Sequence, residues 1–352
     1  MAENGVAAGA DAATLEPRQL VSDLRPFAQA HTGRSIWELA ITLGPLFGIV
    51  LVMLLAVKSG HYLAFALAPL AGALLLRTFI IQHDCGHGGF LPKRTGNDWT
   101  GRALGVLTFT PYDCWKRSHA LHHANTGNLD ARGFGDVDTL TVREFYSRSR
   151  VQRVLYRIYR NPIVLFGVGP AYLFLLRHRL PIGLMKEGPR YWVSAIATNL
   201  ATAAILGSLM FYFGVGTTAL VVLPILLIAA STGVWLFYIQ HQFEQAHWDR
   251  GPDWSFHDAA LKGSSHLDLP QPLRWFTANI GVHHVHHLAS RIPFYRLPDV
   301  LTAYPELRRL NRFTAFQTLY PLALSLWDEN LRRLVSFREA ASGAARSKAR
   351  QA

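Results

Sequence analysis

Residues 192–239 read WVSAIATNLATAAILGSLMFYF, then GVGT, then TALVVLPILLIAASTGVWLFYI. Neither long run contains a charged residue, and only residues 214–217 separate the two. A helix of about 20 apolar residues crosses the roughly 30 Å hydrocarbon core of a bilayer. Buried helices of a large soluble protein are the alternative, but charge-free runs of this length in a close pair are rare there. The stretch therefore predicts a membrane-spanning helical hairpin.

A second pair of apolar runs lies nearer the start of the chain. Residues 36–57 are almost entirely apolar, and residues 62–81 contain one charged side chain, Arg77, near their end. The short turn 58–61 joins them. We therefore predict an all-α integral membrane protein with four transmembrane helices in two hairpins. The predicted spans are about 36–57, 62–81, 192–213 and 218–239.

Lysine and arginine collect outside these runs. Nearly all of them lie in segments 1–35, 82–191 and 240–352, and the chain has a formal net charge of +12. The positive-inside rule places these three segments on the cytoplasmic side, next to anionic membrane lipids. Nucleic-acid binding would also explain a basic chain, but the apolar runs favour a membrane, so we expect no nucleic-acid partner.

The same pattern predicts how the chain is organised. Residues 1–35 are polar, so we expect a cytoplasmic N-terminal tail and no secretory signal peptide. Residues 36–310 would form the membrane domain, with its polar part as a cytoplasmic helical cap. Residues 311–352 would form a cytoplasmic C-terminal tail. The apolar segment 163–176 is short for a crossing, and we expect it at the membrane surface.

Histidines occur in three compact boxes: HDCGH (83–87), HALHH (119–123) and HHVHH (283–287). Spacings of three and four put side chains on one face of a helix, and neutral imidazole is a common metal ligand. The candidate ligands are His83, His87, His119, His122, His123, His283, His286 and His287. Eight ligands are too many for one ion, so the spacing predicts an imidazole-rich site for two metals.

The predicted topology brings these boxes to one side of the membrane. An even number of crossings separates the first and third boxes, whereas a fifth crossing at 163–176 would place them on opposite sides. The fourth span ends in QHQFE (240–244), which delivers His241 to the same face. Scattered structural histidines have no reason to follow this arrangement.

On the evidence of these boxes and their order, the chain resembles the membrane fatty-acid desaturases over roughly residues 35–310. It is most similar to the bacterial and plant acyl-lipid branch, whose best-known members act at the delta-12 (omega-6) position. Further stretches agree with the three boxes: GNLD (127–130), GD (135–136), QHQFE (240–244), GSS (263–265) and NIG (279–281).

This resemblance implies a di-iron enzyme with two Fe ions held by the eight box histidines and by His241. It implies that His284 is not a ligand. The expected reaction uses O2 to introduce a cis double bond into a fatty-acyl lipid. Cys85 and Cys114 are too few for an iron–sulfur cluster, so a separate electron donor of the ferredoxin or cytochrome b5 type is expected.

Acidic and amide side chains near the boxes are candidates for orienting the ligands, because bound imidazoles usually donate their second ring nitrogen to an oxygen. We select Asp84, Glu244 and Asn279 for this role. The other acids near the boxes are Asp130, Asp136 and Asp268.

Other functions are compatible with the boxes. The same scaffold supports hydroxylases, acetylenases and carotenoid ketolases or hydroxylases. A histidine-rich zinc-binding membrane protein, such as a transporter or receptor, is a non-enzyme alternative. Transport predicts ionisable residues within the spans, but the spans contain almost no charge, which disfavours this alternative.

Overall fold

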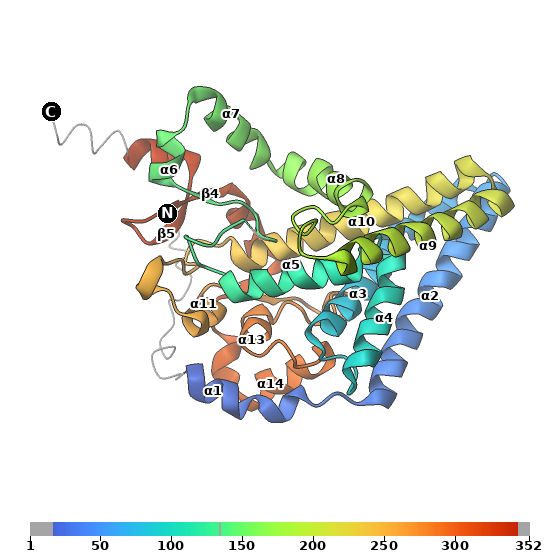
Figure 1. The fold of residues 1–352 in the computed structure, drawn as a ribbon, viewed down its shortest axis with the longest axis horizontal. Coiled ribbons are helices and arrows are strands. Elements are labelled where there is room, and N and C mark those ends of the chain that lie inside the picture. Colours follow the sequence, from blue (N-terminus) through green and yellow to red (C-terminus); the bar gives the residue numbers. More distant parts are fainter. Residues whose placement is uncertain (1–16, 134, 344–352) are drawn as a thin grey trace.

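The computed structural model describes residues 17–133 and 135–343, and these are mainly helical. Four helical segments are long and apolar enough to cross a membrane. They are α2 (Thr32–Lys58), the 3₁₀ turn η3 (Tyr62–Leu67) with α3 (Ala68–His87), α9 (Pro189–Phe213) and α10 (Val215–His241). The prediction of four long apolar helices in two consecutive pairs is therefore confirmed (Figure 1).

Helix α3 is the centre of this bundle, packed between α2 and α10. Its Gly72 allows a close approach, since a Cβ there would lie 2.6 Å from Cγ2 of Ile228 in α10. At one end of the bundle, Nζ of Lys58 donates a hydrogen bond of 2.6 Å to the carbonyl of Tyr212. The two short turns therefore lie together, and α3 and α10 both finish at the opposite end.

The charges inside α2 and α3 neutralise each other. Arg77 is 1% exposed and forms an ion pair with Glu38. The guanidinium also lies 4.1 Å from the ring centroid of Trp275. Buried charges are tolerated when they are paired and hydrogen-bonded, so Arg77 is compatible with an apolar helix.

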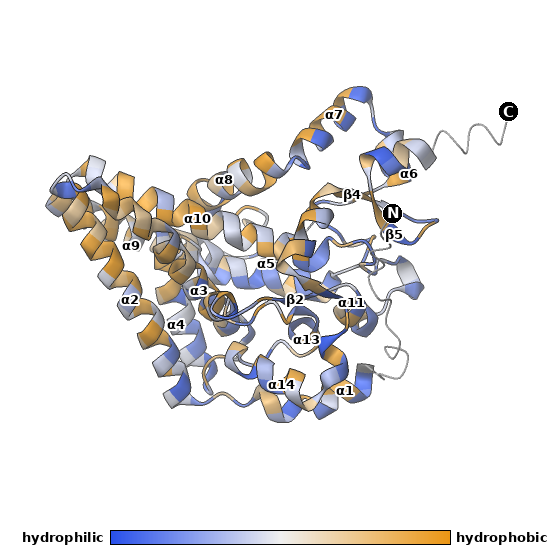
Figure 2. Ribbon diagram, turned by 180° about the vertical axis from the view of Figure 1, so that it is seen from behind, coloured by the Kyte–Doolittle hydropathy of each residue, from blue (hydrophilic) through white to orange (hydrophobic). Residues whose placement is uncertain are grey.

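The other elements form a region that is more polar overall than the four long helices, as Figure 2 shows by its colouring. Its helices are α1 (Pro17–Asp23), α4 (Arg94–Leu107), α5 (Tyr112–Asn125), α6 (Val142–Ser147), α7 (Arg150–Tyr159), α8 (Gly169–Leu175), α11 (Phe256–Lys262), α12 (Leu273–Phe276), α13 (His283–Leu288) and α14 (Leu297–Ala303). The 3₁₀ turns are η2 (Arg25–Ala28), η5 (Arg177–Arg179), η6 (Gly251–Asp253), η7 (Phe294–Arg296), η8 (Pro305–Arg308) and η9 (Ala315–Ala323), and η4 (Val164–Val168) is a π-helix.

Two small sheets complete this region. Strands β1 (Leu140–Thr141), β4 (Leu324–Asp328) and β5 (Arg333–Ser336) form one sheet in the order β1-β4-β5. Strands β2 (His266–Asp268) and β3 (Arg312–Thr314) pair in parallel, with His266 opposite Arg312.

The ends of the chain differ from the predicted tails. Leu20 and Leu24 are buried against the third-box region of the fold, and β3, β4 and β5 all lie beyond residue 310. Leu324, Leu326 and Leu334 are fully buried. The expectation of a tail from residue 311 is thus wrong for 312–336, because this stretch folds into η9 and strands β3, β4 and β5, and β4 and β5 are largely buried. Residues 1–16 and 344–352 lie outside the described residues.

The apolar segment at 163–176 forms a bend in place of a straight helix. Arg150–Tyr159 and Val164–Arg179 would together pass as one span, but they meet at an angle of 60°. Four or five crossings are therefore compatible with the helices, and the surface location of this segment stays a prediction.

Candidate metal centre

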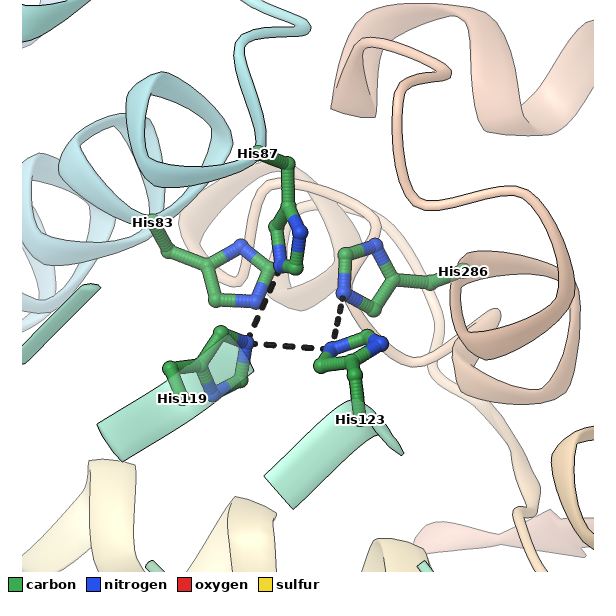
Figure 3. Close-up of side chains that lie close together, drawn as sticks. All are labelled: His83, His87, His119, His123 and His286. Carbon is green, nitrogen blue, oxygen red and sulfur yellow. Dashed lines mark hydrogen bonds between the residues drawn. The ribbon is translucent and has the colours of Figure 1, made fainter. Parts of the chain in front are cut away.

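Five histidines from three helices point toward one another in the first of two groups (Figure 3). They are His83 and His87 of α3, His119 and His123 of α5, and His286 of α13. Each offers one ligand nitrogen, and these nitrogens all lie within 4.8 Å of one another. Nε2 of His119 is 3.0 Å from Nε2 of His87 and 3.1 Å from Nε2 of His123.

Four other histidines form the second group. They are His122 of α5, His241 of α10, and His283 and His287 of α13. Nε2 of His283 is 3.0 Å from Nε2 of His241 and 3.1 Å from Nε2 of His287. All four residues are buried, whereas His87 and His123 of the first group are half-buried. The structure therefore brings together all nine histidines predicted as ligands.

These spacings fit metal coordination. Imidazole nitrogens bind a transition metal at about 2.1 Å, so two ligands at a right angle lie about 3.0 Å apart. Neutral imidazole carries only one ring proton, so neighbouring imidazoles cannot all be satisfied by hydrogen bonds to one another. A cation at the centre of each group would satisfy the converging lone pairs.

The HxxHH pattern divides each box between the groups. In α5, His119 and His123 are four residues apart and face the five-histidine group, while His122 faces the other. In α13, His283 and His287 face the four-histidine group, and His286 turns to the first. Residues at i+3 and i+4 of a helix both lie near residue i but are rotated about 100° from each other, so they can face different groups. One helical turn therefore supplies both groups.

Burial keeps these imidazoles in the form that binds metals. Removal from water lowers the pKa of His119 and His123, and of His283, His286 and His287, well below the usual range. The neutral ring has a free lone pair for a cation.

Oxygen atoms of the protein contact the outer nitrogens of three histidines. Nδ1 of His122 hydrogen-bonds the carboxylate of Asp136, and within the described part of the chain its buried Nε2 has no partner. Nδ1 of His241 is 3.3 Å from the carbonyl oxygen of Gly263. Nδ1 of His83 is 3.3 Å from Oδ1 of Asp84. Such contacts fix the ring tautomer and aim the other nitrogen at the metal.

The three residues selected from the sequence for this supporting role differ in their positions. Asp84 contacts His83 and accepts the backbone N–H of Phe294 at 2.6 Å. Asn279 donates to the carbonyl of Phe294 at 3.1 Å, so it supports the backbone near the third box. Glu244 forms an ion pair with Arg333 of β5, at 2.5 Å. The structure does not bring Glu244 to the histidine groups.

Asp136 is one of several acids near the boxes, and nothing in the sequence distinguishes it from Asp130, which contacts Arg250 in the structure.

His284 belongs to neither histidine group: it is 0% exposed, and its Nε2 lies 2.9 Å from the carbonyl of Leu307. It supports the packing of α13.

An apolar cavity adjoins both groups. It has a volume of about 240 Å³, and His83, His119 and His283 line it. The cavity continues between α3 and α10, where its wall includes Leu75, Leu76, Leu226, Ala229 and Ala230. All five of these residues are buried. The site can therefore hold a long apolar chain beside the histidines.

Comparison with known proteins places this arrangement. A family model described as "Fatty acid desaturase" matches residues 60–318, which contain all nine histidines. This chain belongs to the fatty acid desaturase family. The resemblance drawn from the boxes is thereby confirmed, and the protein is an oxidoreductase of lipid metabolism.

Relatives of this desaturase include proteins from bacteria and plants. The chain is 41% identical over 323 residues to a "Fatty acid desaturase" of Bacillus subtilis, which covers 91% of each chain. It is 31% identical over 242 residues to a Synechocystis "sn-1 acyl-lipid omega-3 desaturase (ferredoxin)", or 64% of this chain and 63% of the relative. It is 27% identical over 267 residues to an "sn-1 oleoyl-lipid 12-desaturase" of Synechocystis, or 70% of this chain and 72% of the relative.

Proposed function

We propose that this desaturase uses O2 to introduce a cis double bond into an acyl chain of a membrane lipid, at the delta-12 (omega-6) position. The observation that carries the proposal is the shared wall: His83 and His119 of one group and His283 of the other line the apolar cavity. A methylene within that cavity lies beside both groups.

Two irons are the metals we propose for these groups. The first would be held by His83, His87, His119, His123 and His286, and the second by His122, His241, His283 and His287. Imidazole suits iron, copper, nickel and zinc alike, so the choice of iron rests on the family. When bound, the irons supply the activation of dioxygen that removal of two hydrogens from an unactivated chain requires.

The residues of the chain supply position and exclusion of water. The buried leucines of α3 and α10 hold the distal part of the acyl chain and keep water away. Asp136, Gly263 and Asp84 orient His122, His241 and His83 through their outer nitrogens. Successive methylenes are chemically almost identical, so the position of the new bond is set by how far the chain reaches past the histidines.

We further propose that the histidine groups lie on the cytoplasmic side of a multi-pass membrane protein. The positive charge of the segments outside the spans supports this orientation. The electron donor would be a separate protein of the ferredoxin or cytochrome b5 type. The printed name of one Synechocystis relative includes ferredoxin.

Double-bond mapping by mass spectrometry tests the proposal. The chain would be expressed with a ferredoxin and its reductase, or with cytochrome b5 and its reductase, in a host that makes oleoyl lipids. We expect dienoic chains with wild type and with His257→Ala, which changes a histidine outside both groups, and none with His122→Ala. Oxygenated lipids or carotenoids would indicate the hydroxylase or ketolase alternative. Zinc in place of iron, with no new lipid, would indicate the non-enzyme alternative.

A further inference from the structure

The cavity reaches the surface of the molecule at a loop remote from its buried end. Among its lining residues, Arg177, Leu180 and Ile182 are exposed, whereas Leu226 and Ala229 at the other end are buried. The 3₁₀ turn η5, Arg177–Arg179, therefore stands at a mouth of the cavity. Gly135, beside Ser118, is also exposed and marks a second opening.

The surroundings of the η5 mouth are apolar. Tyr172, Leu176 and Met185 are 52%, 64% and 42% exposed, and Leu180 and Ile182 are 49% and 41% exposed. Such a cluster of exposed apolar side chains is unusual on a water-facing surface. In a protein with helices suited to membrane spanning, it indicates an opening that faces lipid. An acyl chain still attached to a lipid in the bilayer could enter the cavity sideways at this point.

His178 is the unusual polar residue of this mouth. Its ring lines the cavity, and within residues 17–133 and 135–343 neither ring nitrogen has a hydrogen-bond partner that meets normal geometry; Nδ1 is enclosed by protein, so Nε2 is the nitrogen that a ligand can reach. Two other polar residues of the lining have partners inside the protein: Thr108 donates to Oε1 of Gln82 at 2.5 Å, and Gln240 donates to the carbonyl of Ile280 at 3.0 Å. A polar group without a partner in an apolar cavity is costly. A ligand in the cavity could accept a hydrogen bond from Nε2 of His178.

Neighbouring contacts hold this turn in place. Nη1 of Arg179 donates to Oδ1 of Asn199 in α9 at 2.9 Å, and Nδ2 of Asn199 returns a bond of 2.8 Å to the carbonyl of Arg179. Nη2 of Arg179 donates to the carbonyl of Phe109 at 2.5 Å. Because these bonds tie η5 to α9 and to the link before α5, the position of His178 relative to the metal groups is fixed.

A row of aromatic rings connects His178 to the first metal group along the cavity wall. Ring centroids are 5.0 Å apart for His178 and Phe174, and 6.3 Å apart for Phe174 and Phe79. The row continues from Phe79 to Trp115 at 5.5 Å and from Trp115 to His119 at 4.6 Å. All five residues line the cavity. A chain lying along this row has one end at η5 and an inner methylene at the histidines.

We propose that His178 binds the ester carbonyl of the acyl-lipid substrate and that Arg177 faces its phosphate, so that the new double bond is positioned from the ester end. This inference rests on the proposed function. The ester carbonyl is a hydrogen-bond acceptor next to the acyl chain, and a ring N–H of His178 matches it. The exposed guanidinium of Arg177, one residue away, matches a lipid phosphate at the membrane surface.

A competition between ester and ether lipids tests the carbonyl contact. The holoenzyme, with its electron donor, would be placed in nanodiscs that contain equal amounts of dioleoyl phosphatidylcholine and its dioleyl ether analogue, which lacks the carbonyls. The product ratio measures relative kcat/KM and does not depend on the amount of active enzyme. We expect wild type to favour the ester roughly fivefold, the effect of one hydrogen bond.

Variants separate the contact from a general effect on folding. His178→Phe keeps a ring of similar size and should bring the ester-to-ether ratio close to one, while His178→Gln, which retains a donor, should keep part of the preference. His257→Phe makes the same change away from the cavity lining and should leave the ratio unaltered. A ratio near one in wild type, or an unchanged ratio in His178→Phe, overturns the assignment of His178.

Two further experiments test from which end of the acyl chain the position of the new bond is set, and whether the substrate is a lipid ester or a thioester. With 16- and 18-carbon monoenoic ester lipids, we expect the new bond at the same carbon counted from the ester; a constant position from the methyl end overturns the proposal. Oleoyl coenzyme A, added to nanodiscs of saturated lipid, should be a poor substrate. Turnover of that thioester without turnover of lipid ester overturns the sideways route. If wild type desaturates none of these compounds, the proposed function itself fails.

Discussion

Nδ1 of His122 is hydrogen-bonded to the carboxylate of Asp136, and both groups are largely withdrawn from solvent. The carboxylate accepts the Nδ1 proton, so the lone pair of the ring is on Nε2. That nitrogen is buried and has no hydrogen-bond partner within the described residues, but it faces the other three histidines of its group. The pair therefore converts an ordinary imidazole into a directed ligand.

Replacing Asp136 should weaken the four-histidine group for its metal. In Asp136→Asn the charge that favours the Nδ1–H tautomer is gone, and loss of such a partner typically lowers metal affinity by about 10- to 100-fold. Iron measured after dialysis should fall toward one ion per chain, with helical circular dichroism unchanged. Asp130→Asn is the matched control, since Asp130 contacts Arg250 on the surface. Retention of two irons in Asp136→Asn would show that His122 does not need this carboxylate.

His122 and His284 should respond differently to removal. His122→Ala deletes a member of the four-histidine group, so we expect no desaturation while the protein still inserts into membranes. His284→Ala should keep both metals, but it leaves the buried carbonyl of Leu307 without its partner at 2.9 Å. That loss costs about 1–3 kcal/mol, which a lower melting temperature would reveal. A metal lost from His284→Ala would mean that the third box is misassigned.

The members of the site were accessible from the sequence because they follow local periodicity. HxxHH fixes which side chains share a face of a helix, and the position of His241 at the end of an apolar run fixes its end of the bundle. The four long helices followed from composition in the same way. These features depend on residues close together in the chain, and tertiary packing does not change them.

The division into five and four histidines was not accessible. Each of α5 and α13 contributes to both groups, so the division depends on how the two helices are rotated against α3 and α10. Long-range contacts also explain the differences at Glu244, which Arg333 engages from β5, and at Asp136. The strands beyond residue 310 were missed for the same reason: β4 pairs with β1, and the paired residues Leu140 and Leu326 are 186 positions apart. No local pattern records that pairing.

Acid should destabilise the metal-free protein. Burial holds the pKa of His283, His286 and His287 well below the usual range, whereas in the unfolded chain these groups take up protons near pH 6.5. The unfolded state then binds more protons, so stability is full above about pH 6.5 and is lost as the pH falls toward the folded-state values. Each histidine contributes up to about 1.4 kcal/mol per pH unit in that window.

Melting temperatures of chelator-treated protein in detergent, between pH 7.5 and 5.5, would measure this effect. His286→Asn removes one of the three groups and should make the pH dependence shallower. His61→Asn changes an exposed histidine in the turn before η3 and should leave it unaltered. A melting temperature that does not vary over this range would contradict the assignment of these side chains as buried and neutral.

A methyl group at Gly86 should disturb the site without touching a ligand. Gly86 lies between His83 and His87 in α3, and a Cβ there would be 2.8 Å from Cζ3 of Trp115. The indole of Trp115 stacks on His119, with centroids 4.6 Å apart and planes 16° from parallel. Gly86→Ala must therefore push Trp115 against His119 or into the cavity that it lines, and such overpacking costs about 1–3 kcal/mol.

We expect Gly86→Ala to reduce desaturation by about tenfold, as 1.4 kcal/mol would, and to lower the melting temperature through the same overpacking. Adding Trp115→Leu should restore part of the loss, because the smaller side chain makes room for the new methyl group. Gly48→Ala is the control, since a Cβ on Gly48 of α2 has no neighbour within 4 Å among the described residues. The measurement is product formation by Gly86→Ala, by Gly48→Ala and by the double variant Gly86→Ala/Trp115→Leu. If the double variant is less active than Gly86→Ala alone, the steric explanation is wrong. Trp115 would then support His119 through a contact that the new methyl group does not disturb.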